Sequence, residues 1–136
     1  MHGAAGLLLV RRDGTGRATH VVLQHRAPWS DAGGTWGVPG GARAPGEDAV
    51  AAALRESHEE AGIDPRAVAV RSTHVLAHPD WSYTTVVADE VGTVEPRPTD
   101  DESVEVAWVA LDDVPARPLL PAFADAWPVL RAALDD

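Results

Sequence analysis

Residues 41–63 read GARAPGEDAVAAALRESHEEAGI, and this stretch decides how the middle of the chain folds. Most residues from 49 to 54 are strong helix formers. Asp48 is a favourable N-cap, and Gly62 suits the left-handed backbone position that follows the end of a helix. The stretch therefore predicts a helix over residues 49–61 that is entered from a glycine-rich loop.

The predicted helix has two faces that differ in chemistry. Glu56, Glu59 and Glu60 stand at i, i+3 and i+4, so they fall within one arc of roughly 100°. A different and mostly apolar stripe is expected to face the core, and it consists of Val50, Ala53, Leu54, Ser57 and Ala61. Three like charges near a helix C-terminus repel one another and oppose the helix dipole. A solvated acidic patch is one interpretation; a site for a hard divalent cation, which would make the interaction favourable, is the other.

Outward from this helix, apolar runs alternate with turn signals. Strands are expected at Gly6–Val10, His20–His25, Val70–Ala77, Ser82–Ala88 and Val104–Leu111. Residues 26–46 are rich in glycine and predict a long functional loop. A second helix is expected over residues 121–134, with Pro128 breaking it, kinking it or starting a new first turn. This order predicts one α/β domain, residues 1–136, with a mixed sheet.

Composition narrows the range of functions. The 136 residues are 45% hydrophobic and 24% charged, which fits a globular domain with a real core. A net charge of -10 argues against a nucleic-acid polymer as partner. The absence of cysteine excludes disulfides, thiolate zinc sites and a cysteine nucleophile, and the absence of lysine excludes Schiff-base chemistry. No apolar run approaches the roughly 20 residues of a membrane span, so we expect a soluble cytoplasmic protein with no membrane partner.

Residues 41–63 resemble the Nudix box, the signature of the Nudix hydrolase family. That pattern is Gly, five residues, Glu, seven residues, Arg-Glu, an aliphatic residue, any residue, Glu-Glu, any residue, Gly and an aliphatic residue. The matching residues are Gly41, Glu47, Arg55, Glu56, Glu59, Glu60, Gly62 and Ile63. Ser57 replaces the first aliphatic residue, a departure that concerns packing more than chemistry. The resemblance implies a Nudix-type α/β/α sandwich with a mixed β-sheet between helices.

The resemblance also implies roles for individual residues. The metal site, for Mg²⁺ or alternatively Mn²⁺, would be formed by Glu56, Glu59, Glu60 and Gly41. The catalytic set would be Glu59, Glu56, Arg55 and Glu102, with Arg55 orienting the glutamates by ion pairing. Glu47 would support the site at the junction of loop and helix. Glu102 is the candidate for an additional glutamate from a loop before a late strand, where it competes with Asp100, Asp101 and Glu105. The general base stays open between Glu59 and Glu102.

Candidate substrate-binding residues surround the box, namely Arg26, Arg43, Trp36, Trp81 and Tyr83. The arginines would contact phosphates and the aromatic side chains would stack on a base, whereas surface ion pairs and core packing are the alternatives.

The substrate implied by the family is a nucleoside diphosphate linked to another group. We favour a small-molecule (deoxy)nucleoside triphosphate, including an oxidised one such as 8-oxo-dGTP, cleaved to monophosphate and pyrophosphate. Pro79 lies sixteen residues after Ile63, a spacing that in this family often accompanies ADP-ribose hydrolases. ADP-ribose or another nucleoside diphosphate sugar is therefore the alternative substrate, and a non-catalytic nucleotide-binding module is a lesser alternative. Many family members are homodimers, so a homodimer also stays open.

Overall fold

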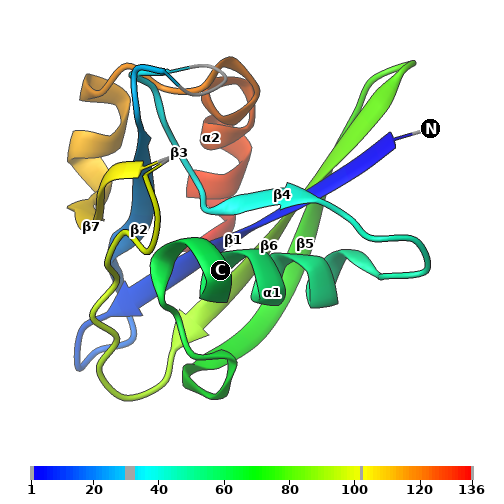
Figure 1. The fold of residues 1–136 in the computed structure, drawn as a ribbon. Coiled ribbons are helices and arrows are strands. Elements are labelled where there is room, and N and C mark those ends of the chain that lie inside the picture. The colour runs from blue at the N-terminus through cyan, green and yellow to red at the C-terminus, as the bar shows by residue number, and fades with distance from the viewer. Residues whose placement is uncertain (1, 30–32, 102, 136) are drawn as a thin grey trace.

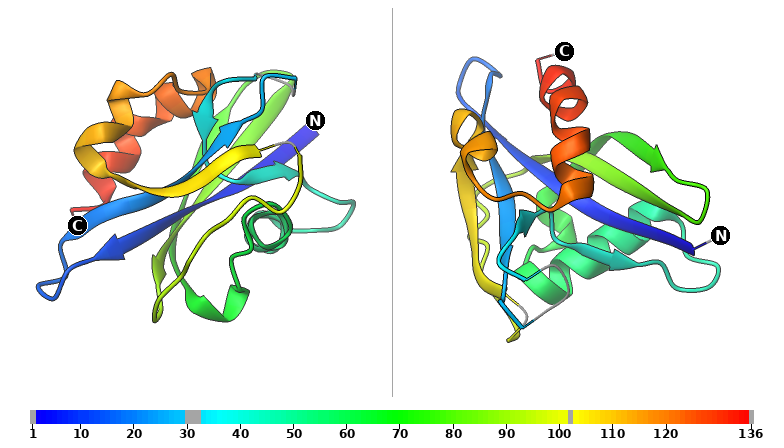
Figure 2. Two further views of the ribbon diagram at one scale, coloured as in Figure 1. Left: turned by 60° about the vertical axis from the view of Figure 1, so that its left-hand side comes forward. Right: turned by 90° about the horizontal axis from the view of Figure 1, so that it is seen from above.

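The computed structural model describes residues 2–29, 33–101 and 103–135 (Figure 1). The elements are β1 (His2–Arg12), β2 (Ala18–Arg26), β3 (Trp36–Gly37), β4 (Gly40–Ala42), α1 (Ala49–Ala61), η1 (Pro65–Ala67), β5 (Val68–Ala77), β6 (Trp81–Glu90), β7 (Ser103–Ala110), η2 (Leu111–Ala116) and α2 (Pro121–Ala133). The helices α1 and α2 cover opposite faces of the sheet, as Figure 2 shows from above. This arrangement confirms the predicted α/β/α sandwich. No helix in the described ranges is long and apolar enough to cross a membrane.

Strand β1 runs through the middle of the sheet and is buried on both faces. Leu7 and Leu9 pack with side chains of α1, whereas Leu8 and Val10 pack with side chains of α2. An uninterrupted apolar run is what a strand covered on both faces requires. The described strands follow the order β3-β2-β1-β6-β5, with β4 paired to β1 and β7 to β2. Only the β1–β6 pair of these is parallel, so the sheet is mixed as predicted.

Strand β1 changes its antiparallel partner along its length, and this change makes room for the site. Residues 4–6 pair with β4, whereas residues 10–12 pair with β2. Between these two stretches, the Leu7 amide donates to the Pro39 carbonyl at 2.9 Å. Strands β2 and β4 therefore diverge, and the C-terminal half of α1 lies against β4.

Helix α1 has the predicted boundaries and caps. The Asp48 carboxylate accepts a hydrogen bond from the Ala51 amide at 2.7 Å, and Gly62 adopts a left-handed conformation at φ 68°. Ser57, which replaces an aliphatic residue of the family pattern, is fully buried. Its hydroxyl donates to the Leu54 carbonyl at 3.2 Å, so a polar group enters the core without losing its hydrogen bond.

Two expectations need correction. The glycine-rich segment 26–46 is not only loop, because it contains β3 and β4, which pair with β2 and β1. Helix α2 runs through Pro128 without a break. Pro128 is exposed, while Trp127 and Leu130 beside it are buried in the core. Burial of these flanking side chains offsets the lost backbone hydrogen bond.

Candidate active site

Arg55 organises the acidic side chains at the junction of the loop and α1. Its Nε and Nη2 atoms donate to the two carboxylate oxygens of Glu47, each at 2.9 Å. Its Nη1 atom donates to Glu56 at 2.9 Å and to Glu59 at 3.4 Å. The Arg55 contact lowers the pKa of Glu47 to about 2, helped by the Ala44 amide. One guanidinium therefore holds three carboxylates, which is the arrangement expected for Arg55 and Glu47.

Glu60 points to the other side of the site, toward β4. Its Oε2 atom accepts a hydrogen bond from the Gly40 amide at 3.1 Å. Burial, together with the negative charge of Glu56, raises the pKa of Glu60 to about 7 against the opposing effect of that amide. The charge of Glu56 thus disfavours ionisation of Glu60, a conflict that a nearby cation would relieve.

Two glycines of β4 allow this close approach. A Cβ atom on Gly41 would lie 2.7 Å from the Glu56 carboxylate, and one on Gly40 would lie 2.4 Å from the Ala5 carbonyl oxygen. Backbone atoms therefore exclude a side chain at Gly40, whereas a side chain at Gly41 would displace the Glu56 carboxylate. Gly41 lies beside Glu56, as the family pattern implies. Because Gly41 has no side chain, the Glu56 carboxylate can lie directly against it.

The donor set fits a hard divalent cation. Glu56 and Glu60 offer clustered carboxylate oxygens of the kind that Mg²⁺ and Mn²⁺ prefer, and Glu60 is half-buried with an unfavourable charge. Glu59, with a side chain 57% exposed, reaches toward Arg55 rather than toward Glu60. In the part of the chain described, no three His, Asp or Glu side chains already converge as a complete metal site. A cation would have to draw Glu59 away from Arg55, and its exposure makes that rotation inexpensive.

Arg26 and Tyr83 lie close to Glu60. The positive charge of Arg26, at the end of β2, lowers the pKa of Glu60, so the two groups lie within electrostatic reach. Burial raises the pKa of Tyr83, and Glu60 raises it further. The Tyr83 hydroxyl lies 2.8 Å from where a Cβ on Gly40 would be. These two predicted substrate-binding residues thus come together at the acidic site.

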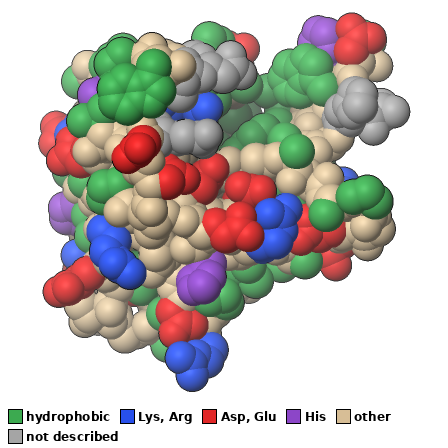
Figure 3. Space-filling model, viewed as in Figure 1, with side chains coloured by type: hydrophobic (Ala, Val, Ile, Leu, Met, Phe, Trp, Pro, Cys, Tyr) green, Lys and Arg blue, Asp and Glu red, His purple; other side chains and the backbone are tan. Residues whose placement is uncertain are grey.

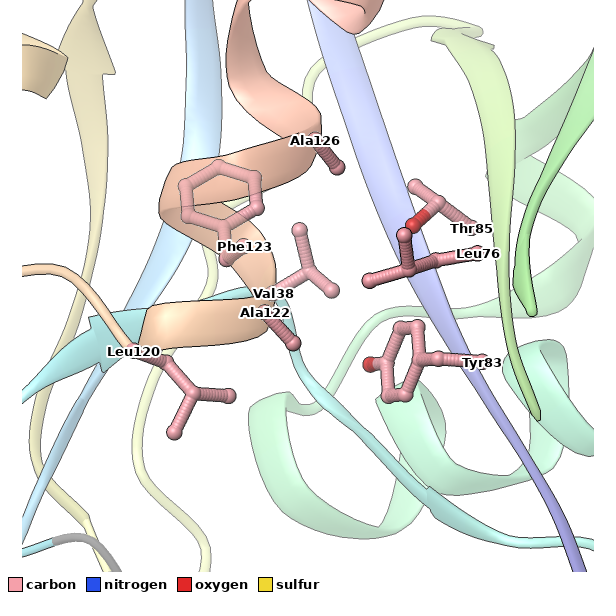
Figure 4. Close-up of a pocket in the computed structure, with 8 residues that line it drawn as sticks. All are labelled: Val38, Leu76, Tyr83, Thr85, Leu120, Ala122, Phe123 and Ala126. Carbon is pink, nitrogen blue, oxygen red and sulfur yellow. The ribbon is translucent and has the colours of Figure 1, made fainter. Parts of the chain in front are cut away.

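Tyr83 also belongs to a narrow apolar pocket on the α2 side of the sheet, with a cavity volume of about 20 Å³. Figure 4 shows side chains from β5, β6, the segment before β4 and α2 directed into it; they are Val38, Leu76, Tyr83, Thr85, Leu120, Ala122, Phe123 and Ala126. The space-filling view shows acidic side chains gathered over α1 and an apolar hollow directly above them (Figure 3). Tyr83 therefore connects an apolar pocket with a charged site.

Trp36 lies in a different environment from the one expected of a substrate-binding residue. It is 8% exposed, its ring stacks on His25 at 4.5 Å, and the Arg117 guanidinium lies 4.9 Å from its centroid. Its amide and carbonyl bond to Pro118 and Leu120 at 2.8 Å each. These contacts and its burial place Trp36 in the core rather than on an exposed surface.

The remaining predicted residues lie at the edge of the site or outside the described chain. The Arg43 Nε atom donates to the Glu47 carbonyl at 3.0 Å, and Arg43 lines an open groove formed by the loop before α1. Trp81 is 36% exposed and stacks on His78 at 4.9 Å in the β5–β6 turn. Glu102 falls outside the described residues.

Comparisons with known proteins identify the family. A profile of the NUDIX domain matches residues 1–133. This chain belongs to the Nudix hydrolase family. It is 45% identical to a Nudix hydrolase from M. smegmatis, RenU, whose crystal structure superposes with a TM-score of 0.85 over 97% of this chain and 84% of that one.

Two curated Nudix relatives are longer than this chain. A "Nucleoside triphosphate pyrophosphatase/Nudix hydrolase fusion protein" from Bifidobacterium longum is 54% identical over 99% of the chain, which spans 29% of that relative. A Mycobacterium tuberculosis protein named "Putative 8-oxo-dGTP diphosphatase 3" is 49% identical over 97% of the chain, which spans 63% of it.

The apolar side of this Nudix site is what the sequence did not indicate. Leu76, Leu120 and Phe123 come from three separate segments and line the pocket with Tyr83. Nothing in their local pattern distinguishes them from core residues. Leu76 of β5 and Tyr83 of β6 are cross-strand partners, so their side chains share one face of the sheet.

Proposed function

We propose that this protein is a Mg²⁺-dependent hydrolase that cleaves a (deoxy)nucleoside triphosphate, with oxidised nucleotides such as 8-oxo-dGTP favoured, to monophosphate and pyrophosphate. The observation that carries the proposal is the excess of negative charge at the C-terminal half of α1. Glu47, Glu56 and Glu59 share Arg55, while Glu60 is half-buried beside Glu56 with a raised pKa. This excess of negative charge does not stabilise the fold, whereas a cation bound together with a diphosphate would make the arrangement of carboxylates favourable.

The proposed roles follow from the positions of the side chains. Glu56, Glu59 and Glu60 hold the cation, with Gly41 leaving room for Glu56, and Mn²⁺ would serve in place of Mg²⁺. A bound Mg²⁺ supplies neutralisation of the phosphate oxygens and acidification of a coordinated water. Arg55 keeps Glu56 oriented through its anchor on Glu47.

The chain's own groups would then handle the proton and the phosphates. A glutamate carboxylate, of Glu59 or Glu102, accepts the proton of the attacking water as the new P–O bond forms and the bond to the leaving phosphate breaks. We assign the pairing with the substrate phosphates to Arg26, which is within electrostatic reach of Glu60, and to Arg43, which bonds to the Glu47 carbonyl.

We place the nucleobase at the apolar pocket beside the glutamates. The pocket's lining is apolar apart from Tyr83 and Thr85, and Tyr83 extends from it to the acidic site. Because the cavity volume is only about 20 Å³, the lining side chains would have to move apart for a flat heteroaromatic ring to enter while the phosphates reach the carboxylates. The name of the M. tuberculosis relative supports an oxidised purine as that ring. Trp81, exposed at the rim of β6, is proposed as an accessory stacking surface.

The test is a product-resolved assay on the purified protein. It would be incubated with Mg²⁺ and, in turn, with the common dNTPs, 8-oxo-dGTP, ADP-ribose, nucleoside diphosphate sugars and dinucleoside polyphosphates. We expect monophosphate and pyrophosphate from a triphosphate, and no turnover when Mg²⁺ is replaced by a chelator. AMP and ribose 5-phosphate from ADP-ribose alone would replace the triphosphate with the diphosphate-sugar substrate. Tight nucleotide binding without product from any substrate would overturn the enzymatic proposal.

A further inference from the structure

A short segment crosses the end of α1 beside the glutamates, and we name residues 94–99 the strap. The strap starts from a fixed point, because both backbone polar groups of Val94 are held by side chains. Its amide donates to Glu90 at 2.8 Å, and its carbonyl accepts from the Trp108 indole at 2.9 Å. Glu90 is itself held by two hydrogen bonds from Arg11, each at 2.8 Å.

From this anchor the strap reaches the last carbonyl groups of α1. The Arg97 amide donates to the Ala61 carbonyl at 2.9 Å, and the Thr99 amide donates to the Glu60 carbonyl at 3.3 Å. The Thr99 hydroxyl donates to the Glu59 carbonyl. Helix ends leave such carbonyls without partners inside the helix. The strap therefore supplies partners for three consecutive residues, and two of them are the glutamates of the proposed cation site.

The sequence of the strap suits this task. Pro96 and Pro98 lack an amide proton and restrict the backbone, and they alternate with the two residues that donate, Arg97 and Thr99. Every backbone amide proton from 97 to 99 is thus used on α1. A stiff segment whose amide donors at residues 97 and 99 are both directed at one helix end holds that end more firmly than a flexible loop would.

The strap also sets the position of Asp100, the next residue. The charge of Asp100 contributes to the raised pKa of Glu60, so its carboxylate is within electrostatic reach of the site. Beyond it, the Gln24 amide donates to the Ser103 hydroxyl at 2.5 Å, and both side chains are buried. Thr99 and Ser103, on either side of the acidic residues, are therefore both held by hydrogen bonds.

We propose that Thr99 is a positioning residue for divalent-cation binding, because its hydroxyl and amide fix the last turn of α1, with Glu59 and Glu60, against the strap. The inference rests on the proposed Mg²⁺-dependent function. Thr99 acts through the two glutamates and touches neither cation nor substrate.

The experiment measures Mn²⁺ affinity by calorimetric titration of the full chain, without nucleotide. Thr99→Val removes the hydroxyl donor and keeps the shape, while Thr99→Ser keeps the donor. Thr19→Val is the matched control, because the Thr19 hydroxyl donates to the Arg11 carbonyl at 3.2 Å, away from the glutamates. We expect Thr99→Val to weaken Mn²⁺ binding about 3- to 10-fold, and Thr99→Ser to stay within about twofold of wild type.

Stability and kinetics separate positioning from mere packing. Both valine variants are expected to lower the Tm by about 3 °C, yet only Thr99→Val should lose Mn²⁺ affinity and kcat while the KM for nucleotide stays unchanged. Equal Mn²⁺ affinity in Thr99→Val and Thr19→Val would overturn the inference. Mn²⁺ binding that weakens as expected in a protein without hydrolytic activity would sink the proposed function and leave the role of Thr99 standing.

Discussion

The molecule contains two arginine–glutamate clusters that look alike and differ in charge balance. Arg11 makes a two-point ion pair with Glu90, and the Glu90 carboxylate also accepts a hydrogen bond from the Val94 amide. Arg55 makes the same two-point pair with Glu47 but also contacts Glu56 and Glu59. The first cluster is neutral and complete, whereas the second carries an excess of negative charge.

This difference separates a structural ion pair from a functional site. At Arg11 every group has its partner, the Glu90 side chain is 8% exposed, and the guanidinium lies 4.1 Å from the Trp108 ring centroid. At Arg55 the surplus charge falls on Glu59, which is largely exposed, and on Glu60, whose pKa burial raises to about 7. The first cluster should therefore govern stability and the second should govern activity. Three substitutions test this division.

The largest effect is expected from Glu59→Gln. The side chain keeps its size but loses the charge needed for cation binding, so turnover should fall by at least about a hundredfold. Its contact with Arg55 is a single exposed one at 3.4 Å, so the Tm should stay within about 2 °C of wild type. Nucleotide hydrolysis and thermal unfolding measure the two quantities.

Asp125→Asn is the control for that substitution, because Asp125 is an exposed acid on α2, across the sheet from α1. It should leave both turnover and Tm at the wild-type values. A Glu59→Gln protein that unfolds readily and retains its specific activity would reverse the roles of the two clusters.

Glu90→Gln should act on stability. It removes a charged partner of Arg11 in a largely buried setting, and the free energy of unfolding should fall by about 2 kcal/mol. Arg11 lowers the pKa of Glu90, so the pair stabilises the native state above the unfolded pKa of about 4.3, and that contribution is lost as the pH falls through the lower native pKa. The free energies of denaturant unfolding of wild type and variant should thus converge as the pH falls from 7 to about 3. A stability gap that stays constant or widens on acidification would contradict the assignment, and exposed Glu105→Gln serves as control.

Gly41→Ala should produce the smallest effect of the three. The added Cβ would lie 2.7 Å from the Glu56 carboxylate and would push it from its place beside Arg55. We expect turnover to fall about tenfold, as is typical when support for a metal ligand is lost. Gly14→Ala is the matched control, since a Cβ at Gly14 meets no atom within 4 Å. Equal activity of the two alanine variants would show that Glu56 can move without consequence.

The fold was predictable where local patterns determine it. The caps and boundaries of α1 follow from Asp48 and Gly62, and β1 follows from its apolar run. The short strands β3 and β4 were missed because their pairing depends on long-range contacts with β2 and β1 rather than on their own residues. The continuity of α2 through Pro128 was likewise decided by packing of its buried face.

The site was predictable where spacing on one helix brings charges together, and less so where distant segments meet. Arg55, Glu47 and Glu56 lie together as the motif implied. Trp36 carried the same aromatic signal as Tyr83, yet only the structure separates the core residue from the one beside the glutamates. The pocket is lined by several segments, and the strap depends on contacts with α1, so no local sequence pattern predicts either of them.

The central claim is that the surplus charge at Arg55 is a divalent-cation site, and Mg²⁺-dependent thermal unfolding tests it most directly. A cation that binds only the native state raises the Tm as its concentration increases. For wild type we predict a rise of about 8 °C when Mg²⁺ exceeds its Kd about a hundredfold, and for Glu59→Gln a clearly smaller rise at the same concentration. The Glu90→Gln protein should melt lower but gain as much from Mg²⁺ as wild type does. A wild-type Tm that does not respond to Mg²⁺, or a response unchanged in Glu59→Gln, would contradict the account.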